Sequence, residues 1–146
     1  MATEQGSVPP AETIEAPEVR LGELLPGGLA PAILGIVDRG VRRRPAPARA
    51  LRAEVELTIE DGYPPVRIVF GQNDVLVEDG ICPSADVRIK GALPDLITLL
   101  VAPLVKGWPN PINARGRAAL QLVTSRRVRL EGRISLLRQV LGVIRV

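Results

Sequence analysis

The sequence offers few residues for acid–base, nucleophilic or metal chemistry, and their types exclude most classes of enzyme. It contains no His, which removes the commonest general base and most zinc sites. Cys82 is the single cysteine, so no intrachain disulfide and no cysteine-based metal cluster can form. Asp86 and Asp95 are the best-placed acids, but no base or nucleophile accompanies them. We therefore expect a protein that is not an enzyme and that uses no metal or cofactor.

Two motifs that suggest phosphate or nucleic-acid binding also lack necessary parts. Gly27-Gly28 has neither the lysine nor the spacing of a phosphate-binding loop. A basic cluster could contact nucleic acid, but bases also need aromatic side chains to stack on, and the chain has one Trp, one Tyr and one Phe. We expect no nucleic-acid partner. The basic cluster consists of Arg115, Arg117, Arg126, Arg127, Arg129 and Arg133.

Charge is distributed unevenly along the chain. Residues 1–25 hold five Glu and one Arg, whereas residues 106–146 hold one Lys and eight Arg against one Glu. The basic part predicts transient contact with an anionic membrane surface, at roughly 1 kcal/mol per close contact. The acidic part either shields the basic part or serves only solubility. Scattered prolines and a lack of periodicity predict that residues 1–27 form a flexible tail.

Residues suited to an apolar site are abundant instead. Hydrophobic residues make up 46% of the chain but aromatic ones only 2%, so the interior must be aliphatic. This composition reflects either codon usage, because 17 Arg stand against 2 Lys, or a smooth aliphatic cavity. The longest apolar run, residues 96–105, is too short to span a bilayer, and no signal peptide opens the chain. We expect a cytoplasmic protein.

The segments that must position these residues include one unit that occurs twice. VRIKGALPDLITLL (87–100) and VRLEGRISLLRQVL (128–141) lie 41 residues apart. Each combines a short alternating strand, a glycine and an apolar run with helical spacing. We interpret each unit as a strand with an amphipathic helix folded back over it.

Alternation with a period of two predicts the remaining strands. Residues 51–59, 65–70, 75–79 and 85–90 read as four strands joined by short turns, which indicates an antiparallel meander. Residues 127–132 are the fifth strand. Each strand has an apolar and a charged face, so we expect a sheet covered on one side, with cross-strand Arg–Glu pairs on the other.

Four helices complete the predicted fold. The first runs from Pro31 to Arg44, the second follows Gly91, the third spans 114–123 behind an Asn113 cap, and Ser135 caps the last. The expected fold class is α+β, with a five-stranded, mainly antiparallel sheet, helices over one face and an apolar cavity between the layers.

This order of elements resembles the sterol-carrier-protein-2 (SCP2) sterol-binding domain family. Ala85-Asp86 precedes an alternating strand, Asp95-Leu96 lies in the following helix, and residues 127–132 stand in for the family's late G-x-L-x-I-x-G strand. The resemblance covers about residues 29–146, and we assign residues 28–146 to one SCP2-like domain. This chain has Arg133 where the family often has an acidic residue after the late glycine, and its segment from Lys106 to Arg126 is longer than in most members of the family.

The resemblance implies binding or transfer of a sterol, fatty acyl chain or similar lipid in an aliphatic cavity, without catalysis. The alternative is a lipid-free interaction or oligomerisation module, in which the same leucines only pack a core. The sequence does not set the oligomeric state. Trp108 lies between an apolar helix and the Arg-rich segment and is expected at the cavity mouth. The candidate lipid-binding residues are Phe70, Leu93, Leu96, Ile97, Leu100, Leu104, Trp108, Leu137, Val140, Leu141 and Ile144.

Overall fold

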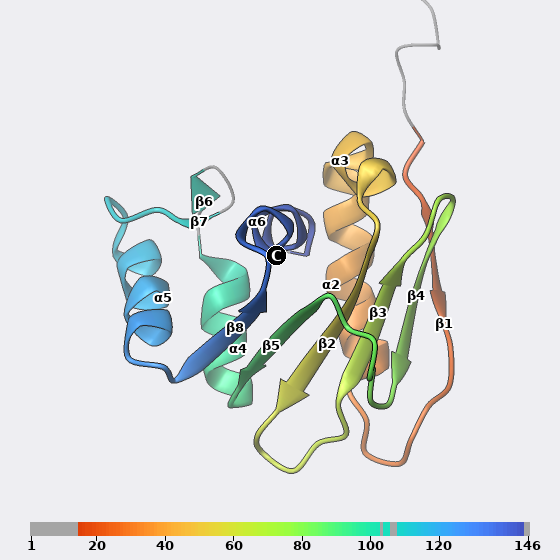
Figure 1. Ribbon diagram of the computed structural model, residues 1–146, viewed down its shortest axis with the longest axis horizontal. Helices are drawn as coiled ribbons and strands as arrows, with labels where there is room; N and C mark the ends of the chain where they lie inside the picture. Colours follow the sequence, from red (N-terminus) through yellow and green to blue (C-terminus); the bar gives the residue numbers. More distant parts are fainter. Residues whose placement is uncertain (1–14, 103, 106–107, 145–146) are drawn as a thin grey trace, which may run out of the picture.

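The computed structural model describes residues 15–102, 104–105 and 108–144 (Figure 1). Its strands are β1 (Glu18–Leu21), β2 (Ala53–Ile59), β3 (Val66–Phe70), β4 (Asp74–Asp79), β5 (Val87–Gly91), β6 (Leu104–Val105), β7 (Trp108–Pro109) and β8 (Val128–Gly132). Its helices are α2 (Ala30–Arg43), α3 (Pro45–Ala50), α4 (Leu93–Val101), α5 (Ala114–Thr124) and α6 (Ile134–Val143). Within the described residues, no helix is long and apolar enough to cross a membrane.

The main sheet has six strands in the order β1-β4-β3-β2-β5-β8, whereas five were predicted. The pairs β2–β3, β3–β4 and β5–β8 are antiparallel, and the pairs β1–β4 and β2–β5 are parallel. The mixed α+β class and the five predicted strands are therefore confirmed. The short β6–β7 pair forms a second sheet that the sequence pattern did not predict.

The additional strand is β1, which lies in the segment assigned to the flexible tail. It pairs with β4 from Glu18 opposite Asp74 to Leu21 opposite Val77, and Arg20 forms an ion pair with Asp74 at 2.7 Å. Residues 18–21 therefore belong to the main sheet, although they lie within the segment assigned to the flexible tail. Of the four residues of β1, only Val19 is half-buried and the others are exposed. The sequence of this strand is too short to show an alternation of apolar and polar residues, so the pattern did not predict it. The prediction for residues 1–14 lies outside the described residues.

The predicted four-strand meander ends after β4. Residues 80–86 cross β3 and β2 and place β5 beside β2 in a parallel pair. Three strand spacings amount to roughly 14 Å, which seven extended residues can bridge. The crossing lies on the charged face of the sheet, because Cys82 N donates to Glu56 Oε2 at 2.7 Å and Ser84 Oγ donates to Glu54 Oε1 at 3.0 Å.

The charged face carries a row of alternating charges across five strands. Glu78, Arg67, Glu56, Arg88 and Glu131 lie in register on β4, β3, β2, β5 and β8. Arg67 pairs with Glu78 at 3.3 Å, and Arg88 pairs with Glu56 at the same distance. These contacts confirm the predicted cross-strand pairs. Glu56 is only 9% exposed because the 80–86 crossing covers it.

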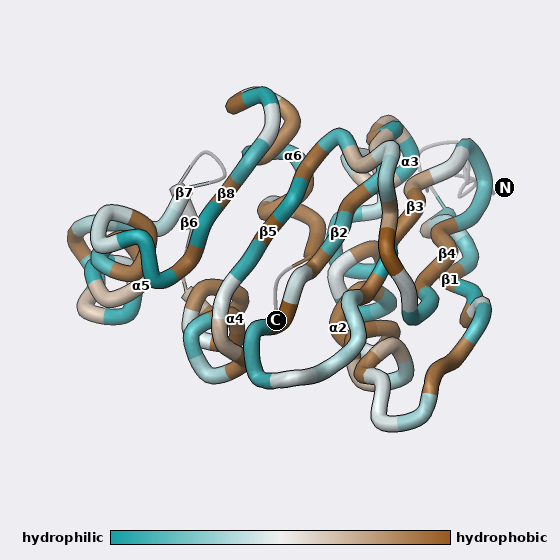
Figure 2. The backbone as a smooth tube through the Cα atoms, turned by 60° about the horizontal axis from the view of Figure 1, so that its bottom comes forward, coloured by the Kyte–Doolittle hydropathy of each residue, from teal (hydrophilic) through white to brown (hydrophobic). Residues whose placement is uncertain are grey.

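The opposite, apolar face of the sheet packs against α2, α4 and α6, and Figure 2 shows the alternation of brown and teal along β5 and β8. Asn113 caps α5, as predicted, by accepting the N–H of Arg115 at 2.8 Å. Ser135 does not cap α6, because that helix begins at Ile134 and Arg133 occupies the cap position. The connection between β8 and α6 is therefore shorter than the preference for a Ser cap at residue 135 indicated.

Asp79 fixes the start of α2 to the end of β4. Its carboxylate is 5% exposed and accepts the backbone N–H of Ala30 at 3.0 Å and that of Leu25 at 2.9 Å. An acceptor at this point satisfies N–H groups that a helix start leaves without partners. Gly28 must lack a side chain, because a Cβ there would overlap the Asp79 carboxylate. Asp79 therefore sets the position of α2 over the sheet.

We predict that Asp79→Ala lowers the free energy of unfolding by about 2–4 kcal/mol, because two backbone N–H groups lose their acceptor. Urea denaturation measures this loss. The matched control is Asp74→Ala, which removes the exposed ion pair with Arg20 and should cost less than about 1 kcal/mol. Equal losses in the two variants would contradict the anchoring role of Asp79.

Candidate functional site

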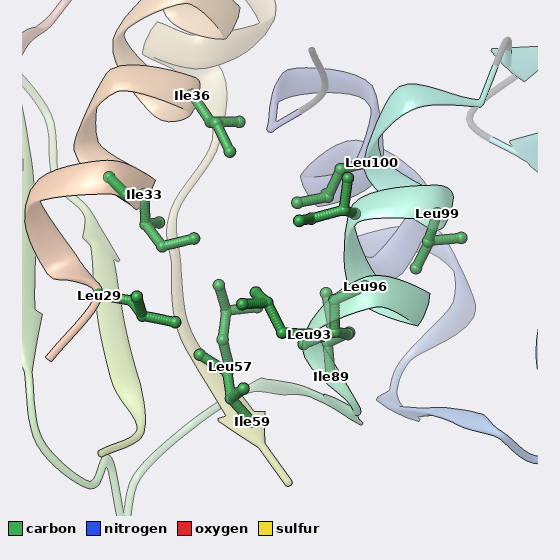
Figure 3. Close-up of a pocket in the computed structure, with 12 residues that line it drawn as sticks. Leu29, Ile33, Ile36, Leu57, Ile59, Ile89, Leu93, Leu96, Leu99 and Leu100 are labelled. Carbon is green, nitrogen blue, oxygen red and sulfur yellow. The ribbon is translucent and has the colours of Figure 1, made fainter. Parts of the chain in front are cut away.

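An apolar pocket of about 170 Å³ lies between α2 and α4, above β2 and β5 (Figure 3). All twelve side chains that line it are aliphatic. They are Leu29, Ala32, Ile33 and Ile36 at α2, Leu57, Ile59 and Ile89 on the strands, and Leu93, Leu96, Ile97, Leu99 and Leu100 on α4. The site therefore offers dispersion contacts and no hydrogen-bonding side chain.

The walls of the pocket follow from the periodicity of each element. On α2, Ala32 and Ile36 lie one turn apart and face the gap. On the floor, Leu57 of β2 lies opposite Ile89 of β5 in the parallel pair. In Figure 3 Ile33 and Ile36 of α2 and Leu100 of α4 point toward one another across the gap, whereas Leu99 extends from the far side of α4.

The gap exists because the two helices cover different halves of the sheet. Helix α2 contacts β1, β3 and β4, whereas α4 contacts β5 and α5. The inner face of β2 lies between these halves, so Leu57 and Ile59 border open space. At the rim, Ala32 is exposed and Ile97 is 47% exposed, which places the mouth of the pocket between these two residues.

The size of the pocket limits what it can enclose. An engineered apolar cavity of roughly 150 Å³ binds benzene, so 170 Å³ accommodates a group of about six carbon atoms. A longer chain has to extend through the mouth beside Ile97. The pocket is thus too small to enclose a whole sixteen-carbon chain.

Four of the eleven candidate residues line this pocket, namely Leu93, Leu96, Ile97 and Leu100. The side chain of Leu104 lies outside the described residues. Five others are buried elsewhere in the core and do not line the pocket: Phe70, Leu137, Val140, Leu141 and Ile144. Helix α6 packs beside α2 and α3, so its apolar stripe is used for packing.

Trp108 does not line the pocket either. It is half-buried in β7, which contacts α5 and α6, and Arg138 of α6 lies 5.7 Å from the centre of its ring. This distance is in the range of a cation–π interaction. The mouth expected beside Trp108 is therefore not the mouth of the pocket between α2 and α4.

Eight lining residues were absent from the candidate set: Leu29, Ala32, Ile33, Ile36, Leu57, Ile59, Ile89 and Leu99. Their burial was foreseeable, because Ile33 and Ile36 follow helical spacing and Leu57, Ile59 and Ile89 alternate. The sequence of α4 also contains more apolar residues than one helical stripe needs, and Leu99 is one of them. The spacing of apolar residues in the sequence does not give the position of α2 relative to α4, so it does not predict that these residues line one pocket.

The acids and the thiol lie outside the pocket, and each has a structural partner. Asp95 pairs with Arg127 at 3.1 Å, and Asp86 accepts the N–H of Glu54 at 2.9 Å. Hydrogen bonds from Ser84 and Cys82, and then the Arg67 ion pair, lower the pKa of Glu54. Burial raises the pKa of the Cys82 thiol, which favours its unreactive protonated form.

Comparison with known proteins identifies the fold. No family model matches the sequence, and no curated protein matches it. The solved structure of "UbiJ-SCP2 Ubiquinone synthesis protein" is similar over 80% of this chain and 88% of its own, at 15% identity and a TM-score of 0.56. The predicted SCP2-like fold is confirmed.

Two further solved structures are similar at lower scores. Sterol Carrier Protein 2 Like 2 from Aedes aegypti matches 80% of this chain and 100% of its own, at 18% identity and a TM-score of 0.45. The sec-alkylsulfatase Pisa1 from Pseudomonas sp. matches 68% of this chain and 14% of its own, at 18% identity and a TM-score of 0.46.

We predict that Leu100→Ala costs less than about 2 kcal/mol, because Leu100 already borders open space and loses few contacts. Leu51 is fully buried and does not line the pocket, so Leu51→Ala should cost about 3–5 kcal/mol. Chemical denaturation of both variants makes the comparison. A loss at Leu100 as large as that at Leu51 would indicate a filled core at α4.

Proposed function

We propose that this SCP2-like domain binds one end of a long aliphatic lipid in the pocket between α2 and α4, and holds it without catalysis. The observation that carries the proposal is the wholly aliphatic lining, which reaches the surface beside Ile97. Such a lining has no polar side chain that fixes one headgroup, so it suits several lipids that share a chain.

The energetics of the pocket suit a carrier. Moving six methylene groups from water into the pocket gains about 5 kcal/mol, at about 0.8 kcal/mol each. The same groups gain almost nothing when they come from a bilayer, because they were already in hydrocarbon. A shallow apolar pocket of this kind can therefore accept a chain from a membrane and return it.

The volume favours a flexible chain over a rigid ring system. The end of an acyl or prenyl chain fits a space of about 170 Å³, whereas the fused rings of a sterol exceed a cavity of benzene size. The similar UbiJ-SCP2 protein is named for ubiquinone synthesis, and ubiquinone carries a polyprenyl chain. A polyprenyl chain is accordingly the first probe beside a fatty acid.

The proposed setting is the surface of an anionic membrane in the cytoplasm. Ile97 stands exposed at the pocket mouth, where it can enter the boundary of a bilayer. Arginines exposed on α2, among them Arg39 and Arg43, add attraction to anionic lipids. A single buried thiol is suited to the reducing cytoplasm.

We predict that Ala32→Phe blocks binding, because Ala32 lines the pocket at its exposed rim and a phenyl ring there fills the opening. Binding of a fluorescent long-chain fatty acid and of a polyprenyl alcohol should weaken at least about tenfold, as expected for a loss of roughly 1.4 kcal/mol or more. The matched control is Ala118→Phe, which places the same ring on the exposed face of α5.

The control should bind like the original protein. Native mass spectrometry after gentle purification should show a bound lipid that Ala32→Phe lacks and Ala118→Phe retains. If both variants bind lipid equally, the ligand lies elsewhere. If the original protein binds neither probe and carries no lipid, the domain is a lipid-free module.

A further inference from the structure

We propose that the free edge of β8, together with the groove between β8 and α5, binds an extended acidic segment of a partner protein as an added β-strand. The groove has a volume of about 350 Å³ and is lined by Val123, Arg126, Val128, Arg129, Leu130 and Glu131. This site lies apart from the lipid pocket and does not depend on the proposed lipid.

The edge of the sheet at β8 is open in the described residues. Strand β8 ends the order of the main sheet and pairs on one side with β5. Figures 1 and 2 both show α5 beyond β8, past the edge of the sheet, so that a helix flanks the open strand. A strand with an open edge beside a helix is a geometry in which extended peptides bind.

The direction of the backbone groups shows which residues of β8 can accept a partner. The backbone carbonyl of Gly91 accepts the N–H of Glu60 at the end of β2, so the backbone groups of Gly91 point toward β2. Because these groups alternate in direction along a strand, the backbone groups of Arg88 and Lys90 point toward β8. Their partners on β8 are Glu131 and Arg129. The backbone groups of Leu130, between these two, therefore point away from the sheet.

Arg126 provides an independent observation at the groove. It has a φ of 64°, and it stands at the end of α5 where Arg127 N donates to Leu122 O at 2.9 Å and Arg126 N donates to Val123 O at 3.2 Å. This pattern is the Schellman motif, in which the left-handed residue is usually Gly. An arginine that accepts this unfavourable conformation and lines the groove indicates a use for its charge.

The charges and side chains of the site define the chemistry of the partner. Arg126, Arg127, Arg129 and Arg133 are exposed along this edge. Glu131 lies among them and Arg127 already pairs with Asp95, so Arg126, Arg129 and Arg133 supply the charge for a partner. A strand added beside β8 would bring acidic side chains within reach of Arg129. Its alternate side chains would face the apolar part of the groove, so a segment of alternating acidic and apolar residues fits best.

A second copy of this chain is a less suitable occupant. Pairing β8 with β8 of another copy would bring two arginine clusters together, and like charges across strands oppose pairing. Pairing β8 with β1 of another copy would leave further edges free and build an open chain of copies. An acidic partner segment meets neither difficulty.

The test uses a fluorescein-labelled peptide of eight residues with alternating Glu and Val, and fluorescence anisotropy with the full chain. We expect saturable binding, and we expect none for the same peptide with Lys in place of Glu. Arg126→Gly should raise the melting temperature, because Gly adopts a positive φ more easily, and should weaken peptide binding at least about threefold. Arg42→Gln is the matched control, because Arg42 lies on α2 and pairs with Asp38.

A second variant tests strand addition directly. Leu130→Pro removes an N–H that points away from the sheet, which an edge strand tolerates, and should weaken binding at least about tenfold. Leu130→Ala keeps this N–H and should bind within about threefold of the original protein. Two peptides with N-methyl groups at odd or at even positions repeat the test without changing the protein, and one of them should lose binding.

Several outcomes would overturn the proposal. The first is no saturable binding of the acidic peptide, and the second is equal binding of both methylated peptides. The third combines two results: oligothymidylate, a nucleic-acid competitor, displaces the bound peptide as well as unlabelled acidic peptide does, and a folded Leu130→Pro variant binds the peptide fully. Sedimentation that shows copies associating through β8 would assign the edge to a second copy instead. Because lipid binding by Ala32→Phe is measured separately, failure here leaves the lipid proposal intact.

Discussion

The attachment of residues 80–86 to the charged face of the sheet is the interaction on which the rest of the fold depends. The Glu56 carboxylate of β2 accepts the N–H of Cys82, and the backbone carbonyl of Glu54 accepts that of Asp86, so the chain crosses two strands before it continues as β5. The crossing puts β5 beside β2 and leaves β8 at the edge. The pocket floor requires β5 beside β2, and the open edge requires β8 beyond β5, so both depend on this crossing.

The pocket then results from the way in which two helices share a sheet of six strands. Asp79 holds the start of α2 near β4, and α4 follows β5 directly after Gly91. The inner face of β2 lies between them and carries Leu57 and Ile59 toward the gap. Empty apolar space lowers packing stability, because its lining loses contacts, and a ligand chain can restore them.

Much of the fold was predictable because alternation is a local property. The strands β2 to β5 and β8 follow it over five to seven residues, and the helix stripes of α2, α4 and α6 follow helical spacing. Pairing partners were not predictable in the same way, because nothing within residues 85–90 states that β5 lies beside β2. The four residues of β1 were too few to show alternation at all.

The candidate site was predictable only in part, for a related reason. The apolar stripe of α4 identified Leu93, Leu96, Ile97 and Leu100. The similar stripe of α6 packs into the core, and a stripe alone does not distinguish a core helix from a pocket wall. The position of Trp108 between two contrasting segments suggested a mouth, yet its ring lies against Arg138. The distance between α2 and α4 decides which side chains line a pocket, and this distance is set by contacts between residues that are far apart in the sequence.

A methyl NMR titration of isoleucine-labelled protein with a long-chain fatty acid tests the central claim most directly. Five isoleucines line the pocket, namely Ile33, Ile36, Ile59, Ile89 and Ile97, whereas Ile68 is buried without lining it and Ile134 is exposed. The account predicts saturable shifts at these five, with Ile68 and Ile134 changing little. Shifts centred on Ile134, or no saturable shift at any of the five, would contradict a lipid site between α2 and α4.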